Sequence, residues 1–213
     1  MGFESMRCVY VVSHAQSLHH VEKRVGGWYD TGLTEIGRSQ AMKTAEFLVS
    51  EIKGDIVVYS SDLRRAFETA EIIASQLGVD FHLDNRLREM SYGIAEGKSK
   101  EWGDTHIQPQ PIDGDRMNHR VFEGAESKLE LAKRMNLVLS DILSGSVENV
   151  VIVTHGFAST FLVMAWMKIS VEYLGYVNLP SKPGCVSKLV EDDFFGNRGM
   201  EYLCKTVHLE NRL

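Results

Sequence analysis

Short β-branched runs alternate with amphipathic helical patterns along most of this chain, and this alternation limits the fold more than any other feature. The runs with the length and composition of buried strands are 7–13, 55–61 and 147–156. The helical patterns that follow them are 33–52, 62–78 and 157–169. Such alternation predicts an α/β fold with a mostly parallel central sheet flanked by helices.

The remaining segments complete one domain over residues 1–213. Thr34 is the expected N-cap of the first long helix, and Ile36 is among the apolar residues at its helical spacing. Gly78 is the expected C-terminal cap of the second helix. Further expected elements are a short strand at 79–84, a helix at 126–143 and a C-terminal hairpin at 185–210. The irregular stretch 91–124 is long for a compact domain, which is typical of a functional lid.

Composition excludes several classes of protein. The net charge is −6 and no Lys/Arg-rich run is present, which argues against a nucleic-acid partner. The 3 cysteines are odd in number and widely spaced, so they predict no disulfide framework and indicate a reducing, cytoplasmic setting. We expect no signal peptide. We also expect no membrane span, because the most apolar window, 150–167, contains His155 and Gly156. A homodimer is kept as a hypothesis.

Reactive side chains follow the ends of the predicted parallel strands. Ligands of open α/β sheets bind beyond these carboxyl ends, so we expect the side chains there to converge on one crevice. They are Ser13 and His14 after the first strand, Ser60, Ser61, Arg64 and Arg65 after the second, and Thr154, His155 and Gly156 after the last.

Two imidazoles, guanidinium groups and hydroxyls suit phosphoryl chemistry. Cations and helix N-termini bind phosphoryl oxygens, and a neutral imidazole can attack phosphorus to form a covalent intermediate. The leaving alkoxide then needs a proton, which Glu89 or Glu96 in the loop 87–97 could supply.

Six segments in order resemble the histidine phosphatase superfamily, which includes the cofactor-dependent phosphoglycerate mutases. The family has Arg-His-Gly after its first strand, where this chain has Ser13, His14 and Ala15. The other five matches are "DTGLTEIGRSQA" (30–41), "SDLRRAFETA" (61–70), "LREMSYGIAEG" (87–97), "GAES" (124–127) and "VIVTHG" (151–156).

The resemblance implies roles for the matched positions. His14 would become phosphohistidine, Arg65 and His155 would hold the phosphoryl oxygens, and Glu89 would give and later take a proton. It implies a small phosphorylated substrate, no metal and no cofactor. The candidate phosphate-binding residues are Arg65, Ser13, Ser17, His20, Arg24 and Gly156.

The chain departs from the family at positions whose side chains would neutralise the charge of the phosphoryl group. Ser13 replaces the first arginine, and His20 stands where the family often has asparagine. Loss of a transition-state arginine can cost roughly a thousandfold in rate. Three outcomes remain open: a weaker enzyme, a pseudoenzyme that only binds a phosphate ligand, or a pocket in which the segment 19–24 restores the charge. We expect the last, because the rest of the constellation is intact.

Hydrolysis is favoured over mutase transfer. The "GGWYDTGLTE" segment resembles that of the mutases, but the extra basic residues that would bind a sugar acid have no counterpart here.

Other residues near these motifs have structural interpretations. We expect Arg64 to be a solvated helix residue, Trp28 to line the crevice or merely to pack, and Ser127 to cap a helix. The adjacent His19 and His20 are expected to project apart and to bind no metal.

Overall fold

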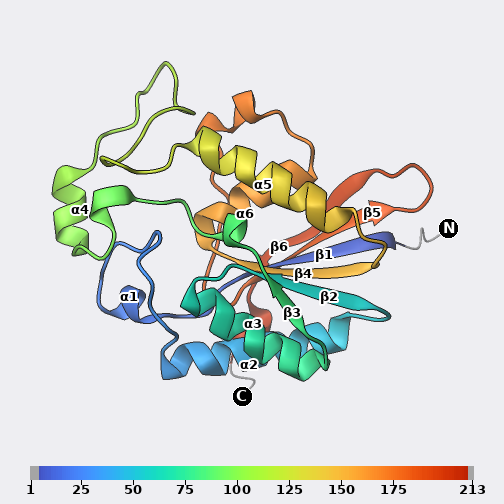
Figure 1. Cartoon of the computed structure of the whole chain (residues 1–213). Helices are drawn as coiled ribbons and strands as arrows, with labels where there is room; N and C mark the ends of the chain where they lie inside the picture. Colours follow the sequence, from blue (N-terminus) through green and yellow to red (C-terminus); the bar gives the residue numbers. More distant parts are fainter. Residues whose placement is uncertain (1–4, 211–213) are drawn as a thin grey trace.

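A six-stranded sheet forms the centre of the molecule in the computed structural model, which describes residues 5–210. The opening residues, where we expect no signal peptide, fall partly outside this range. The strand order is β3-β2-β4-β1-β5-β6. The first four strands run parallel, whereas β5 is antiparallel to β1 and pairs with β6 in the predicted hairpin (Figure 1). The strands are β1 (Ser5–Ser13), β2 (Ile56–Ser60), β3 (Phe81–Leu83), β4 (Asn149–Thr154), β5 (Val186–Asp192) and β6 (Arg198–Lys205).

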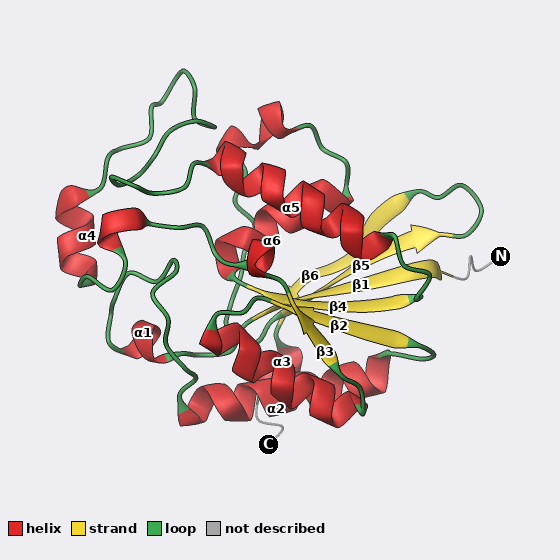
Figure 2. Cartoon of the chain, viewed as in Figure 1, coloured by secondary structure: helices red, strands yellow, loops and turns green. Residues whose placement is uncertain are grey.

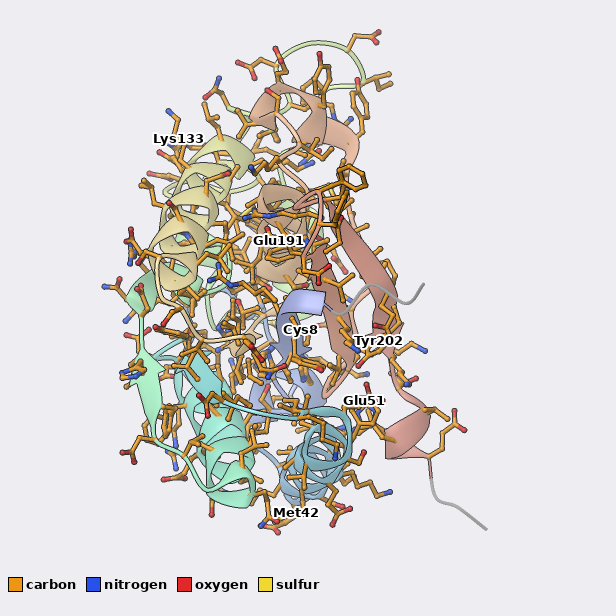
Figure 3. All side chains as sticks on the ribbon, turned by 90° about the vertical axis from the view of Figure 1, so that its right-hand side faces the viewer. Cys8, Met42, Glu51, Lys133, Glu191 and Tyr202 are labelled. Atoms are coloured by element: carbon orange, nitrogen blue, oxygen red, sulfur yellow. The ribbon has the colours of Figure 1, made fainter. Side chains whose placement is uncertain are left out.

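Helices cover both faces of this sheet, as Figure 2 shows. One face carries α2 (Glu35–Glu51) and α3 (Arg64–Leu77), and the other carries α5 (Lys128–Leu143) and α6 (Gly156–Trp166). Figure 3 places Met42 of α2 and Lys133 of α5 on opposite outer sides, with Cys8 of β1 between them. This three-layer arrangement confirms the predicted α/β fold.

Two hydrophobic cores result from the alternation of side chains along the strands. In β4, Val150 and Ile152 pack toward α5 and α6, while Val151 and Val153 pack toward α2 and α3. All six residues of β4 are buried, which explains its continuous apolar run. No helix within residues 5–210 has the length and apolar character needed to cross a membrane.

The helix ends follow the local sequence. The Thr34 side chain accepts a hydrogen bond from Gly37 N, and Ser127 forms a capping box with Glu130, as expected of these N-caps. Gly78 ends α3 with a left-handed φ of 70°. Of the apolar residues at the helical spacing of α2, Ile36 in the first turn is 61% exposed, whereas Ala45 and Leu48 are buried in the core.

The segment 91–124 lies with α1 (Leu18–Val21) beyond the carboxyl ends of the parallel strands (Figure 1). It contains a 3₁₀ turn, η2 (Gly93–Ala95), and the short helix α4 (Lys100–His106). Backbone hydrogen bonds from Val25 N to Lys98 O and from Lys100 N to Lys23 O join this segment to the residues that follow α1. The function of the segment 91–124 as a lid stays a prediction. The other 3₁₀ turns are η1 (Asn85–Leu87), η3 (Val171–Tyr176) and η4 (Val207–Leu209).

Candidate active site

His14 follows β1 directly and has an unprotonated nitrogen in a buried setting. Its Nδ1 lies 2.8 Å from Ala15 O, which identifies Nδ1 as the donor. Its Nε2 accepts a hydrogen bond from Arg65 Nε at 3.2 Å. Burial, and then the positive charge of Arg65, lower the pKa of His14 well below its usual value. The imidazole is therefore neutral at neutral pH, and its unprotonated Nε2 faces the Arg65 guanidinium.

Arg65 is fixed in the first turn of α3 by three partners. It is only 1% exposed, and besides His14 it donates to Tyr29 O at 2.9 Å and to Gly27 O at 2.7 Å. Burial lowers its pKa to about 10, so it remains a cation at neutral pH. Arg64 points to solvent as expected, where it pairs with Glu68 at 2.7 Å.

His155 is the N-cap residue of α6, and its ring centroid lies 5.0 Å from that of His14. The strand order explains this, because β1 and β4 are neighbours and Ser13 pairs with Thr154 in register. The structure thus brings together both histidines and Arg65, as predicted from the strand ends. Burial and Arg65 lower the pKa of His155 well below its usual value.

One nitrogen of His155 has no partner. Ser61 Oγ accepts a hydrogen bond from Leu63 N and lies 2.9 Å from His155 Nε2, and in one tautomer of the ring the hydroxyl donates to this nitrogen. We assign the proton to Nδ1, which is buried without a hydrogen-bond partner among residues 5–210. An unpaired buried donor costs about 1–3 kcal/mol. An anion placed between the two imidazoles would satisfy it.

Glu89 is held at the N-terminus of α6. Its carboxylate oxygens accept hydrogen bonds from Met90 N at 2.8 Å, Phe157 N at 3.0 Å and Ala158 N at 2.8 Å. Glu96 instead orders its own loop, through Ser91 Oγ and the backbone N–H groups of Tyr92 and Trp28. Of the two candidate carboxylates, Glu89 is thus the one joined to the helix that begins beside His155.

The segment after His14 brings two more imidazoles to the site. The His20 ring stacks on the His14 ring at a centroid distance of 5.4 Å, and the His19 ring lies 6.0 Å from it. The expectation that His19 and His20 project apart is wrong, because their rings are 4.1 Å apart. Both Nδ1 atoms bond to Ser17 Oγ, which draws the two rings to the same side of the single turn α1.

Three predicted phosphate contacts have other partners, and the first is Ser17, which is buried and bonds the two histidines. Ser13 Oγ bonds Ser181 Oγ at 2.6 Å. Arg24 donates to Gly97 O at 2.7 Å and pairs with Glu22 at 3.3 Å, so its guanidinium is tied to the loop beside α4. Gly156 is closer to the centre: a Cβ added there would lie 4.0 Å from Glu89 Oε2.

Ser181 is a residue that sequence reasoning missed. It lies in an irregular stretch before β5 that has no periodicity, and only the tertiary fold brings it to Ser13. Trp28 has a partner that the sequence did not indicate. Its indole donates to Glu89 O at 2.7 Å, and the Arg88 guanidinium lies 5.0 Å from its ring centroid. It therefore packs against the loop that contains Glu89.

The neutral histidines predict a strong loss of stability in mild acid. In the unfolded chain each titrates near pH 6.5, whereas burial lowers the pKa of His19 to about 3 and those of His14 and His155 well below normal. Below pH 6.5 the unfolded state therefore binds protons that the folded state does not, and each group removes up to about 1.4 kcal/mol per pH unit.

Urea unfolding at pH 7.0, 6.0 and 5.0 measures this effect. We expect the free energy of unfolding to fall by up to about 4 kcal/mol per pH unit in the lower half of this range, and His14→Ala to remove about a third of the slope. A free energy independent of pH would show that these imidazoles are protonated in the folded protein.

An α/β sheet with two imidazoles and a buried guanidinium at its carboxyl edge defines a class of phosphoryl-transfer proteins that use histidine. The family model described as histidine phosphatase superfamily (branch 1) matches residues 9–195, and this chain belongs to that family. The match extends through most of the chain, from β1 into the β5–β6 hairpin.

Relatives within the family have several activities in their names. A putative phosphoserine phosphatase 2 of Hydrogenobacter thermophilus is 33% identical over 177 residues, covering 82% of this chain and 85% of the relative. A probable phosphoglycerate mutase of Escherichia fergusonii is 37% identical over 161 residues, covering 73% and 72%. A glucosyl-3-phosphoglycerate phosphatase of Mycobacterium tuberculosis is 31% identical over 183 residues, covering 78% and 77%.

A solved structure agrees with the computed fold. The mycobacterial glucosyl-3-phosphoglycerate phosphatase in complex with VO3 superposes with a TM-score of 0.77 at 25% identity, covering 94% of this chain and 100% of that one.

Proposed function

We propose that the protein is a phosphomonoesterase that acts on a small phosphorylated metabolite through a phosphohistidine at His14. The observation that carries the proposal is the neutral imidazole whose Nε2 lone pair faces Arg65 while the His155 ring lies 5.0 Å away. The phosphatase names of two relatives support hydrolysis as the outcome.

The reaction has two steps. In the first, His14 Nε2 attacks phosphorus, the bond from phosphorus to the leaving oxygen breaks, and Glu89 gives a proton to the alkoxide. In the second, Glu89 takes a proton from water, the oxygen attacks the phosphohistidine, and the N–P bond breaks to release phosphate. Arg65 and His155 Nδ1–H bind the phosphoryl oxygens throughout, and the N-terminus of α6 adds a favourable dipole.

His20 is the residue that we propose compensates for the absent arginine. Its Nδ1 accepts a hydrogen bond from Ser17 N at 3.2 Å, so its proton is on Nε2. His20 as a whole residue is exposed although its ring stacks on His14, and its Nε2–H can donate to a phosphoryl oxygen even while His20 is neutral. Burial and Arg65 lower its pKa, which favours the neutral form.

A double-variant cycle tests this compensation. We expect His20→Ala to lower kcat at least about tenfold in the natural protein but by less than about threefold when Ser13→Arg is also present, because the guanidinium then replaces the lost donor. Ser13→Arg alone should raise kcat less than about tenfold, and Ser181→Gly can be added to make room. Equal losses in both backgrounds would show that His20 does not substitute for the arginine.

Trapping of the intermediate tests the function itself. Rapid acid-free quenching of a reaction with a ³²P-labelled phosphomonoester should yield protein-bound label that is lost in acid and kept in alkali, with the modified peptide containing His14. A protein that only binds its ligand would carry no label and release no phosphate. Both failures would contradict the proposal.

Mutase transfer is the second candidate, because the relative at 37% identity is named as a probable phosphoglycerate mutase. Incubation with 3-phosphoglycerate and its bisphosphate primer distinguishes the two reactions. We expect inorganic phosphate as the main product, whereas accumulation of 2-phosphoglycerate would establish the mutase.

The cellular setting is also part of the proposal. The 3 cysteines form no disulfide, which is consistent with a reducing compartment, and we place the enzyme in the cytoplasm without a nucleic-acid partner. A homodimer stays a hypothesis that light scattering can test.

A further inference from the structure

A cavity of about 820 Å³ adjoins the candidate active site. His19 and His20 form one of its walls, and both rings lie next to His14. Met90 and Phe157 form another wall, and their backbone N–H groups bind the Glu89 carboxylate. The cavity therefore contacts both the nucleophile side and the proton-donor side of the reaction.

This position indicates which part of a substrate enters the cavity. In an in-line displacement the leaving oxygen lies opposite the attacking nitrogen and near the group that protonates it. An ester whose phosphorus is at His14 and whose leaving oxygen is near Glu89 would direct its alcohol past Met90 and Phe157. The cavity is thus the place for the alcohol, not for the phosphate.

The walls of the cavity are mostly apolar. Met90, Val121 and Phe122 are buried there, and Tyr92, Phe157 and Ile107 extend the apolar surface. The charged side chains are all exposed to solvent, and they are of both signs: Lys23, Arg24, Lys100, Glu101 and Asp104. No buried cation lines this cavity among the described residues. A carboxylate on the alcohol would therefore find no buried counterion in this cavity.

The size of the cavity also favours a large, mainly apolar ligand. Clefts of about 300–1,000 Å³ bind ligands of drug size, and they are lined mainly by apolar and aromatic groups with few polar contacts. A three-carbon sugar acid would leave most of this cavity unfilled.

We propose that the preferred substrates are phosphomonoesters of bulky, mainly apolar alcohols, whose alkyl or aryl part binds in this cavity. The proposal rests on the proposed phosphatase activity and specifies its substrate class. It departs from the polar compounds named for the relatives, phosphoserine and glucosyl-3-phosphoglycerate.

A homologous series of substrates tests the proposal. Ethyl, butyl and hexyl phosphate have alcohols of similar acidity, so differences in kcat/KM report binding of the alkyl chain. We expect kcat/KM to rise about threefold to fourfold for each added CH₂ group, and hexyl phosphate to exceed 3-phosphoglycerate. A flat series, or a preference for 3-phosphoglycerate, would overturn the proposal.

A matched pair of variants tests whether the alkyl chain binds in this cavity. Ile107 lines the cavity at 48% exposure, so Ile107→Glu should fold and place a charge on the apolar wall. We expect it to lower the ratio of kcat/KM for hexyl phosphate to that for ethyl phosphate at least tenfold. Ile112→Glu is the control, because Ile112 is 84% exposed in the same segment and is not part of the cavity wall. An unchanged ratio in Ile107→Glu would contradict the proposal.

Labelling of His14 separates failure of this inference from failure of the proposed function. If ethyl phosphate labels His14 but the series is flat, the enzyme is a phosphatase with another specificity. If no ester labels His14, the phosphatase proposal itself is wrong, and the cavity can no longer be assigned to the alcohol of a phosphomonoester.

Discussion

His14→Ala is expected to lower phosphomonoester turnover by at least about 10⁴-fold and to eliminate the acid-labile protein label. The reason is chemical: in the proposed mechanism Nε2 forms the bond to phosphorus, and alanine has no atom that can replace it. The side chain is 6% exposed and has one backbone acceptor, so its removal leaves a small cavity and leaves the strand pairing of β1 unchanged. The measurements are steady-state phosphate release and rapid-quench labelling.

The control for this variant is His82→Ala. His82 is an exposed histidine of the edge strand β3, and its ring lies 5.3 Å from Tyr59, away from the candidate site. It should keep both activity and label. Label that persists in His14→Ala would show that another residue carries the phosphoryl group, and the mechanism would have to be reassigned.

Arg65→Lys is expected to reduce kcat/KM about 10³-fold although the positive charge is kept. The guanidinium donates to His14 Nε2 and to two backbone carbonyls at once, so its position is set by three bonds. A lysine ammonium has no planar fork to make these bonds together. We therefore expect weaker binding of vanadate, an analogue of the phosphoryl transition state, by a comparable factor.

Arg64→Lys is the matched control, because it makes the same substitution one residue earlier. The Arg64 side chain is 66% exposed and bonds Glu68, an ion pair whose net value is small. Activity and vanadate affinity should be unchanged within about twofold. If Arg65→Lys were equally mild, the buried guanidinium would be a structural residue of the 27–29 loop and not a phosphate ligand.

The sequence was sufficient to predict the location of the candidate site because the rule for open sheets depends only on strand direction. His14, Arg65 and His155 are far apart along the chain, yet each follows a parallel strand or begins the helix after it. Since β2, β4 and β1 are adjacent in the sheet, these residues meet. Capping residues such as Thr34 were predictable for a similar reason, because their signal is local.

Side-chain partners in irregular segments could not be predicted in this way. Ser181 reaches Ser13 from a stretch that has no periodic pattern, and Arg24 is drawn away to Gly97 by a bridge between two loops. The close approach of His19 and His20 depends on one hydroxyl, that of Ser17, in a four-residue helix. Such contacts arise from tertiary packing, which periodicity and spacing do not encode.

The loop 27–29 contacts two residues of the candidate site, Arg65 and Glu89. Its Gly27 and Tyr29 carbonyls accept from Arg65, while its Trp28 indole donates to the backbone of Glu89. Gly27 has a φ of +58°, and a Cβ there would lie 2.9 Å from Glu96 Oε1, so a side chain at this position would be strained. The proposed phosphate ligand Arg65 and the proposed proton donor Glu89 are therefore held by the same loop. Directed evolution that alters this loop would be expected to change formation and breakdown of the proposed phosphoenzyme together. New alcohol preferences could instead be selected at cavity residues such as Ile107, which contact neither Arg65 nor Glu89.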